Sequence, residues 1–291
     1  QSCVNLLTDV LRESNVTTKQ AVFGLSATSS FITIITLPLL ERKELEAAIP
    51  FEAKKYIPVP IQEVALDWQV VEEDRVSKHL SVLLAAVPHQ VVAKYERITE
   101  LLHLNLQALE IESFSLVRSL LSGERSVSAL INWGAIATTV TVAEERIIRL
   151  NHTFDRGSWE MTTALARGLG VNDDRADALK KEIGLSERPE EREIADILLP
   201  YIDSILLDVE RAVTNYNRGA KRKIEKIVLT GGGANLKGLV GYVAKRFGLE
   251  TVVGNPFVRT TYPEFLQPIL KDIAPNFGVA AGLALRQITP A

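Results

Sequence analysis

Hydrophobic positions in the first hundred residues switch between helical and strand spacing. Val4, Leu7 and Leu11 fall on one face of a helix. The charged segment 41–55 has apolar residues at helical spacing, so it predicts an amphipathic helix, which Pro50 should kink or restart. The stiff connector 57–60 reads Ile-Pro-Val-Pro. Runs rich in β-branched or apolar residues predict strands at 21–25, 30–37, 65–71 and 80–87.

The rest of the chain carries strand and helix patterns in alternation. Buried-type runs predict strands at 107–111, 129–133, 138–142, 147–150, 226–230 and 251–253. Helical periodicity predicts helices at 90–102, 114–121, 159–168, 173–183, 193–217, 239–247 and 276–286. Because strands and helices alternate in the last third, the pattern indicates α/β layers rather than a helix bundle.

Composition narrows the classes of protein. The net charge of −3 gives no basic excess for a nucleic-acid partner. Cys3 is the only cysteine, which excludes an internal disulfide and fits a reducing compartment. No run of ~18 apolar residues occurs, so we expect no membrane span. The chain begins at Gln1 with neither a start methionine nor a signal peptide, so we expect native residues to precede it.

The glycine run Gly231, Gly232 and Gly233 follows the predicted strand 226–230 and is followed closely by Asn235. Glycines here let backbone amides approach a ligand, and a following helix N-terminus favours phosphate. A tight strand-to-helix turn that binds nothing is the alternative. The run lacks a Gly-Lys-Ser/Thr ending, so it is not a P-loop.

Two further patterns could contact a nucleotide. The predicted hairpin through Asn132, Gly134 and Thr138 could wrap phosphates with N–H and hydroxyl groups, or it could be a plain hairpin. Asp177 and Lys180 lie three apart on a helix face, where they could hold a ribose or form a solvated ion pair. The histidines lack metal-ligand spacing, so we expect no metal site; they are His79, His89, His103 and His152. Metalloprotease and serine-hydrolase signatures are absent from the sequence.

Segment 44–60 is a charged helix pattern whose second half reads Glu-Ala-Lys-Lys-Tyr-Ile-Pro-Val-Pro. In this segment the chain resembles the PilM family of type IV pilus assembly, and the stretch 56–60 is the most specific part of the resemblance. Other family marks follow in order at 110–114, at the Gly134 hairpin, at 231–233, at Asn255-Pro256-Phe257 and at 275–286. The glycine turn is shared with the wider group of actin, sugar kinases and the cell-division protein FtsA.

The resemblance implies an α/β, actin-like (ribonuclease H-like) fold of two lobes around a nucleotide cleft, with a small inserted α/β domain. The implied domains are 1–18 with 104–150 as lobe 1 lacking its first phosphate hairpin, 19–103 as the insert, 151–270 as lobe 2, and 271–291 as a helix returning to lobe 1. The implied nucleotide contacts are Asn132, Gly134, Thr138, Asp177, Lys180, Gly231, Gly232, Gly233 and Asn235.

Family members sit in the cytoplasm against the inner membrane and bind the short N-terminal tail of a membrane partner, PilN, linking the platform to the motor ATPases. Bound ATP with Mg²⁺ is expected to be weak or absent here. Asn132 replaces a family aspartate that organises Mg²⁺, Ile136 replaces a small polar residue, and Asp177 replaces a glutamate. The first phosphate loop is absent as well, so we assign no catalytic residue.

Three functions remain open from the sequence. The first is a pilus-assembly scaffold with a peptide groove formed by 31–36 and 45–56, whose candidate contact residues are Phe31, Thr33, Leu45, Ile49 and Tyr56. The second is an active actin-fold ATPase or kinase, against which Asn132 argues. The third is an FtsA-type membrane tether, against which the absence of a basic amphipathic helix at the end argues. A type II secretion setting and self-association stay open.

Overall fold

The computed structural model describes residues 2–287. Contacts between residues divide the chain into two compact units, Gln1–Glu112 and Ser113–Ala291. Each unit has its own buried apolar cluster, so each packs around a separate core.

The first unit contains two sheets. A parallel pair joins β1 (Gln20–Leu25) to β5 (Asn105–Ile111). A three-stranded antiparallel sheet has the order β2-β4-β3, with β2 (Phe31–Pro38), β4 (His79–Pro88) and β3 (Val64–Asp74). The helices of this unit are α1 (Ser2–Glu13), α2 (Arg42–Ala53) and α3 (His89–Leu101).

Helix α2 packs one face on the three-stranded sheet. Its buried residues Leu45, Ile49 and Ala53 recur at a spacing of four, which places them on one face. They meet Ile35 and Leu37 of β2 in a single apolar cluster. The sheet and α2 therefore form a small α/β layer with its own core.

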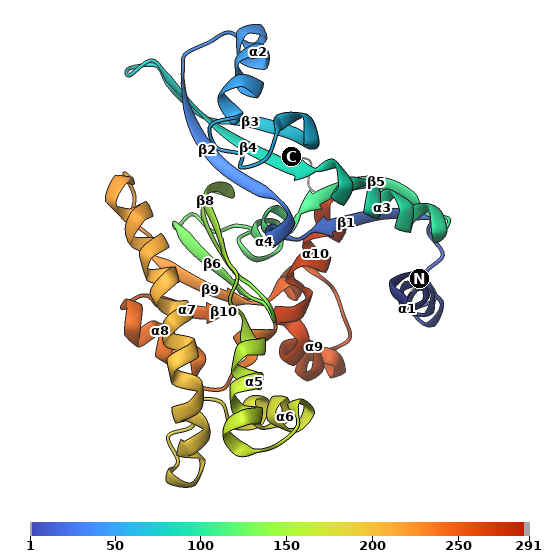
Figure 1. Ribbon diagram of the computed structural model, residues 1–291, viewed down its shortest axis with the longest axis vertical. Helices are drawn as coiled ribbons and strands as arrows, with labels where there is room; N and C mark the ends of the chain where they lie inside the picture. Colours follow the sequence, from blue (N-terminus) through green and yellow to red (C-terminus); the bar gives the residue numbers. More distant parts are fainter. Residues whose placement is uncertain (1, 288–291) are drawn as a thin grey trace. The chain divides into compact units, whose positions relative to one another are not determined.

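The second unit is built on a five-stranded sheet of order β10-β9-β6-β7-β8 (Figure 1). Its strands are β6 (Ser128–Trp133), β7 (Thr138–Glu144), β8 (Ile147–Phe154), β9 (Lys226–Thr230) and β10 (Glu250–Val253). Strand β9 runs parallel to β6 and β10, whereas β6, β7 and β8 form an antiparallel meander. The crossover from β8 to β9 carries α5 (Ser158–Leu169), α6 (Asp173–Ile183) and α7 (Arg192–Gly219).

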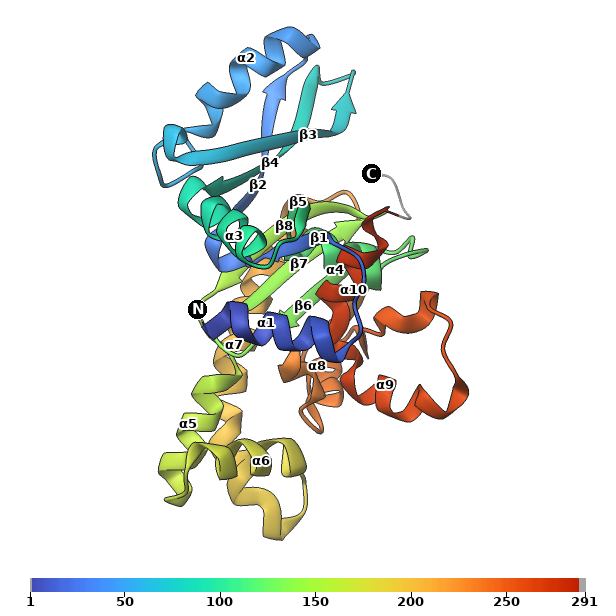
Figure 2. The ribbon, with the colours of Figure 1, turned by 90° about the vertical axis from the view of Figure 1, so that its right-hand side faces the viewer.

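Helix α7 supplies much of the core of the second unit. It has 28 residues, and its buried side chains include Leu198, Ile202 and Val209. These residues share an apolar cluster with the central strands. Helices α5 and α6 lie side by side next to α7 (Figure 2). The remaining helices are α4 (Glu112–Leu120), α8 (Leu239–Phe247), α9 (Gln267–Ile273) and α10 (Gly278–Ala284).

Most of the elements expected from the pattern are present. The strands expected at 21–25, 30–37, 129–133 and 226–230 are confirmed. Of the two effects expected of Pro50, a kink or a restart of the helix, the restart is wrong, because α2 continues through Pro50 to Ala53, and the kink stays a prediction. Pro50 itself is exposed while Ile49 and Ala53 are buried, so core packing offsets the hydrogen bond that the proline removes. The division into lobe 1, insert, lobe 2 and returning helix stays a prediction.

Candidate functional site

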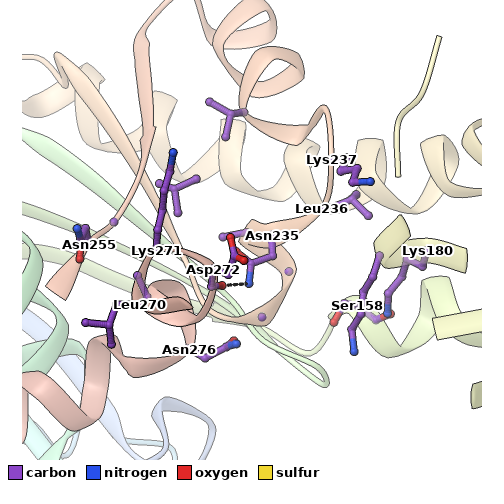
Figure 3. Close-up of a pocket in the computed structure, with 18 of the residues that line it drawn as sticks. Ser158, Lys180, Asn235, Leu236, Lys237, Asn255, Leu270, Lys271, Asp272 and Asn276 are labelled. Carbon is purple, nitrogen blue, oxygen red and sulfur yellow. Dashed lines mark hydrogen bonds between the residues drawn. The ribbon is translucent and has the colours of Figure 1, made fainter. Parts of the chain in front are cut away.

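A cavity of about 1090 Å³ opens in the second unit. One side is formed by α5 and α6, the floor by the glycine turn after β9, and the other side by the end of β10 and by α9 (Figure 3). Five residues expected from the sequence line it, namely Asp177, Lys180, Gly232, Gly233 and Asn235. A cavity of this size takes a nucleotide-sized ligand.

The glycine turn is required by packing as well as by any ligand. Gly231 has φ +80, and a Cβ there would lie 2.6 Å from Asn132 Oδ1. A Cβ on Gly233 would lie 2.5 Å from Cδ1 of Trp133, a fully buried side chain. The Gly231 amide donates to the carbonyl of Pro275 at 2.9 Å. The turn therefore fits against β6 while Gly232 and Gly233 face the cavity.

A short 3-10 turn, Gly232–Asn235, follows the glycines, so the α-helix begins only at Leu239. The Asn235 side chain donates to the carbonyl of Asp272 at 3.0 Å, which ties the turn to α9 (Figure 3). Because this bond joins the floor of the cavity to one of its sides, Asn235 helps to fix the shape of the cavity.

Lys180 is a buried cation at the centre of a polar cluster. Its Nζ donates to Asp177 Oδ1 at 2.8 Å, to the Ser158 carbonyl at 3.2 Å and to Thr162 Oγ1 at 2.5 Å. An ammonium group has three donors, so this arrangement uses all of them. The solvated ion pair that was one interpretation of this motif does not describe it, because the Lys180 side chain is only 9% exposed.

Asp177 is held between two lysines. Its Oδ2 lies 2.5 Å from Nζ of Lys181, which is itself exposed. Burial raises the pKa of Asp177, but the hydrogen bonds and charges of Lys180 and Lys181 outweigh it, so the pKa lies below its ordinary value. The carboxylate is therefore ionised at neutral pH, and the exposed Lys181 leaves positive charge at the edge of the cavity.

The β6–β7 hairpin lies outside the lining of the cavity. Asn132, Gly134, Thr138 and Gly231 are not among the lining residues of the described cavity. Thr138 is buried, and its hydroxyl donates to the Arg156 carbonyl at 2.8 Å, so it is not available to a phosphate.

The hairpin turn instead accepts hydrogen bonds from the start of α5. The amides of Ser158 and Trp159 donate to the carbonyls of Gly134 and Ala135, at 3.0 and 2.8 Å. The hairpin therefore caps α5 with its carbonyl groups. This contact orients the helix that supplies Ser158 to the cavity.

Sequence reasoning missed the far wall of the cavity. Asn255, Lys271, Asp272 and Asn276 line it, together with Tyr262, Gln267 and Leu270. Asn255 had a signal, as the first residue of the Asn-Pro-Phe mark, and its side chain accepts from the Phe257 amide at 3.0 Å. Asn276 fell within the family mark at 275–286 but was not assigned to the site. The others lie on short turns and on α9, where no periodic pattern marks them.

The expected peptide residues of the first unit differ in accessibility. Leu45 and Ile49 are 2% and 0% exposed, so they belong to the core under α2 and cannot contact a peptide there. Phe31 and Thr33 on β2 are half-buried, and Tyr56 is 50% exposed. Of the five residues, these three remain accessible on the first unit.

Within residues 2–287 no group of three or more His, Cys, Asp and Glu side chains could hold a metal ion. In the same part of the chain no helix is long and apolar enough to cross a bilayer. The polar contacts of the cavity are side-chain amides, lysines, hydroxyls, the carboxylates of Asp177 and Asp272, and backbone groups.

A parallel and antiparallel five-stranded sheet, a glycine turn after β9 and a nucleotide-sized cavity beside it define a protein of the actin-like class. Solved structures show the same fold. MreB5 of Spiroplasma citri bound to ADP has a TM-score of 0.58 at 12% identity, covering 98% of this chain and 74% of that one. A chain of the MamK double helical filament has a TM-score of 0.53 at 14% identity, covering 99% and 75%.

A chain from a PilM–PilN type IV pilus biogenesis complex is far more similar in structure. Its TM-score is 0.87 at 23% identity, and the match covers 99% of this chain and 85% of that one. The family model described as type IV pilus assembly protein PilM matches residues 1–288. This chain therefore belongs to the PilM family of type IV pilus assembly proteins.

Proposed function

We propose that this protein is a cytoplasmic scaffold of the type IV pilus assembly platform, held at the inner membrane by the short N-terminal tail of a PilN-like protein. The family match over residues 1–288 carries this proposal. The likeness to a chain of a PilM–PilN complex supports the choice of partner. Contact with the motor ATPases would then be indirect, through the assembled platform.

The first unit offers a surface for such a tail. Strand β2 pairs only with β4 among the described strands, so its other edge has backbone groups that an extended peptide could use. Tyr56 is 50% exposed and Phe51 is 67% exposed, and both lie at the end of α2 and just after it. Phe31 and Thr33 lie on β2 itself. Exposed aromatic side chains and an open strand edge on the same unit suit a short apolar tail.

The cavity of the second unit supports weak nucleotide binding. All three donors of the Lys180 ammonium are used inside the protein, so Lys180 fixes the wall and does not reach a phosphate. The family resemblance puts Asn132 at the position of an aspartate that organises Mg²⁺; in this chain the side chain lies against Gly231, outside the cavity lining, and its neutral amide supplies no charge to a metal. ATP with Mg²⁺ would therefore bind weakly and turn over slowly or not at all.

Calorimetric titration of the protein with a synthetic N-terminal tail of the PilN-like protein from the same genome tests the scaffold role. We expect saturable micromolar binding that does not require ATP. Tyr56→Ala should weaken it about fivefold, the order of 1 kcal/mol for an interface contact. Val76→Ala is the control, because Val76 is 96% exposed on the β3–β4 turn and is not one of the proposed contact residues.

Flat heats from a folded protein would contradict the proposed partner. Equal loss in the Tyr56 and Val76 variants would contradict the proposed surface while leaving the partner in place. The alternative function, an active actin-fold ATPase, predicts instead steady release of phosphate from ATP with Mg²⁺. A type II secretion or cell-division setting would show as binding to the corresponding membrane-protein tail and not to the pilus one.

A further inference from the structure

Exposed basic side chains gather at one end of the five-stranded sheet of the second unit. They come from the segment before β6, from the β7–β8 turn, and from the end of α7 with the loop after it. We call this surface the basic end, and its exposed members are Arg125, Arg146, Arg218, Lys221, Arg222 and Lys223.

Hydrogen bonds hold the three segments together. The guanidinium of Arg222 donates to Glu144 Oε1 at 3.2 Å and to the Arg125 carbonyl at 3.0 Å. The Glu225 amide donates to the Val127 carbonyl at 2.9 Å, which fixes the loop to the start of β6. These bonds place the end of α7, the β7–β8 turn and the segment before β6 next to one another.

The backbone of these segments is well defined. Glu145 and Arg146 both have positive φ, 49 and 68, as in the tight two-residue turns that join antiparallel strands. The Ile224 amide donates to Asn217 Oδ1 at 3.0 Å, and the Lys223 ammonium bonds the Ala220 carbonyl at 3.3 Å at the end of α7. Because the backbone is fixed, little conformational entropy is lost when the basic end meets a surface.

The charge of the basic end opposes that of the whole chain. Segments 122–126, 144–149 and 218–226 hold eight basic and four acidic residues, a net charge of +4 in a chain of net charge −3. Two of the acidic residues, Glu144 and Glu225, are paired with Arg222. The overall composition therefore hides a local excess of positive charge.

We propose that the basic end binds the surface of an anionic lipid bilayer. None of the exposed large hydrophobic side chains of residues 2–287 lies in these three segments. A protein partner would need apolar or aromatic anchors, and bases of single-stranded nucleic acid would need aromatic platforms. A bilayer surface needs only dense positive charge, each Lys or Arg contributing about fivefold in affinity.

Flotation of the protein with vesicles tests this proposal. One set of vesicles is phosphatidylcholine alone, and in the other about a third of the lipid is phosphatidylglycerol. We expect binding only to the anionic vesicles, with a steep fall as salt is raised. Replacing Arg146→Gln and Arg218→Gln together should weaken binding about 25-fold, at fivefold for each charge.

The matched control is Arg167→Gln with Arg192→Gln. Both residues are exposed, the change in charge is the same, and Arg192 lies at the opposite end of α7 from Arg218. The control should bind the anionic vesicles as the parent does. Thermal unfolding of both variants establishes that they are folded.

Three results would overturn the proposal. Equal loss of vesicle binding in both variants would mean that net charge, not the basic end, is responsible. No difference between the two kinds of vesicle would exclude anionic lipid. Binding to duplex DNA or to polyglutamate, lost in the Arg146/Arg218 variant but without vesicle binding, would assign the surface to a different partner. The test does not use the peptide or nucleotide, so it can fail while the scaffold role stands.

Discussion

Gly233 lies directly against the indole ring of Trp133: a Cβ on Gly233 would be 2.5 Å from Cδ1 and 2.6 Å from Cγ of the tryptophan. The ring is fully buried and cannot move aside without disturbing the core of the second unit. This contact, together with the positive φ of Gly231, explains Gly231 and Gly233 without invoking a ligand. It also brings the cavity floor into direct contact with strand β6.

Gly233→Ala should therefore destabilise the second unit by overpacking. We expect a loss of about 1–3 kcal/mol in the free energy of unfolding, measured by urea denaturation followed by far-UV circular dichroism. Gly241→Ala is the matched control, because nothing lies within 4 Å of a Cβ at that exposed helical position. It should be stabilising by up to ~1 kcal/mol. Equal behaviour of the two variants would show that the Trp133 contact is unimportant.

Lys180 should be essential for the stability of the α5–α6 pair. Lys180→Met keeps most of the side-chain volume but leaves the Ser158 carbonyl and Asp177 without their buried donor. We expect a loss of about 1–3 kcal/mol in unfolding free energy. Lys181→Met removes the exposed partner of the same carboxylate and should cost no more than ~0.5 kcal/mol. A loss no larger for Lys180 than for Lys181 would contradict the buried role.

The acid dependence of this effect has a definite sign. The pKa of Asp177 lies below its ordinary value of 3.8, so its ion pairs stabilise the fold above that value and are lost as the pH falls through the lowered pKa. The deficit of the Lys180→Met variant should therefore be constant from neutral pH down to about 3.8 and shrink only below it. Denaturant titrations at a series of pH values measure this, and a deficit that grows on acidification would contradict it.

In the first unit, the effect of Glu112 on stability should depend on pH with the opposite sign. Burial raises its pKa above the ordinary 4.5, and the hydrogen bond from the Ala27 amide at 2.9 Å opposes this only in part. The contribution of Glu112 to the free energy of unfolding is therefore largest below pH 4.5 and falls as the pH rises toward the raised pKa.

Glu112→Gln keeps an acceptor for the Ala27 amide but removes the buried charge. It should raise the melting temperature at neutral pH and leave it unchanged near pH 4, where the parent is already protonated. Glu96→Gln, at an exposed position of α3, should change neither. A stabilisation of the Glu112→Gln variant that persists equally at acid pH would mean that charge burial is not its cause.

The sequence predicted those parts of the fold whose signal is local. Strands such as β9 (Lys226–Thr230) are recognised in the sequence as continuous apolar runs, and α7 is recognised by the helical spacing of its long apolar stripe. Helix α9 (Gln267–Ile273) was missed because none of its residues is buried, which leaves no apolar stripe to find. The cavity wall that it supplies was missed with it.

Roles within the candidate sites were less predictable, because they depend on which neighbour a side chain meets. The spacing of four places Leu45 and Ile49 on one face of α2 and Phe51, which is 67% exposed, on another, but the pattern alone does not say which face packs on the sheet and which would meet a peptide. Thr138 was expected at a phosphate, yet its hydroxyl is engaged by the Arg156 carbonyl, 18 residues away. Tertiary contacts of this kind are not encoded in local spacing.

Asn132→Asp tests whether position 132 limits nucleotide binding. Asn132 Oδ1 lies against Gly231, which precedes the two glycines that line the cavity, so a carboxylate at position 132 would act on bound phosphates through Mg²⁺ and not as part of the cavity lining. With Mg²⁺ present we expect ATP to bind about tenfold more tightly, a gain of ~1.4 kcal/mol. With EDTA the same carboxylate should repel the phosphates and weaken binding, because no cation screens it.

Asn276→Asp adds the same charge at the lining of the cavity and serves as the control for charge alone. Calorimetry with and without Mg²⁺ measures the affinity for ATP under both conditions. A Mg²⁺-dependent gain in affinity only at position 132 would show that the amide restrains ATP binding. No gain there would assign the weak binding to another part of the cavity.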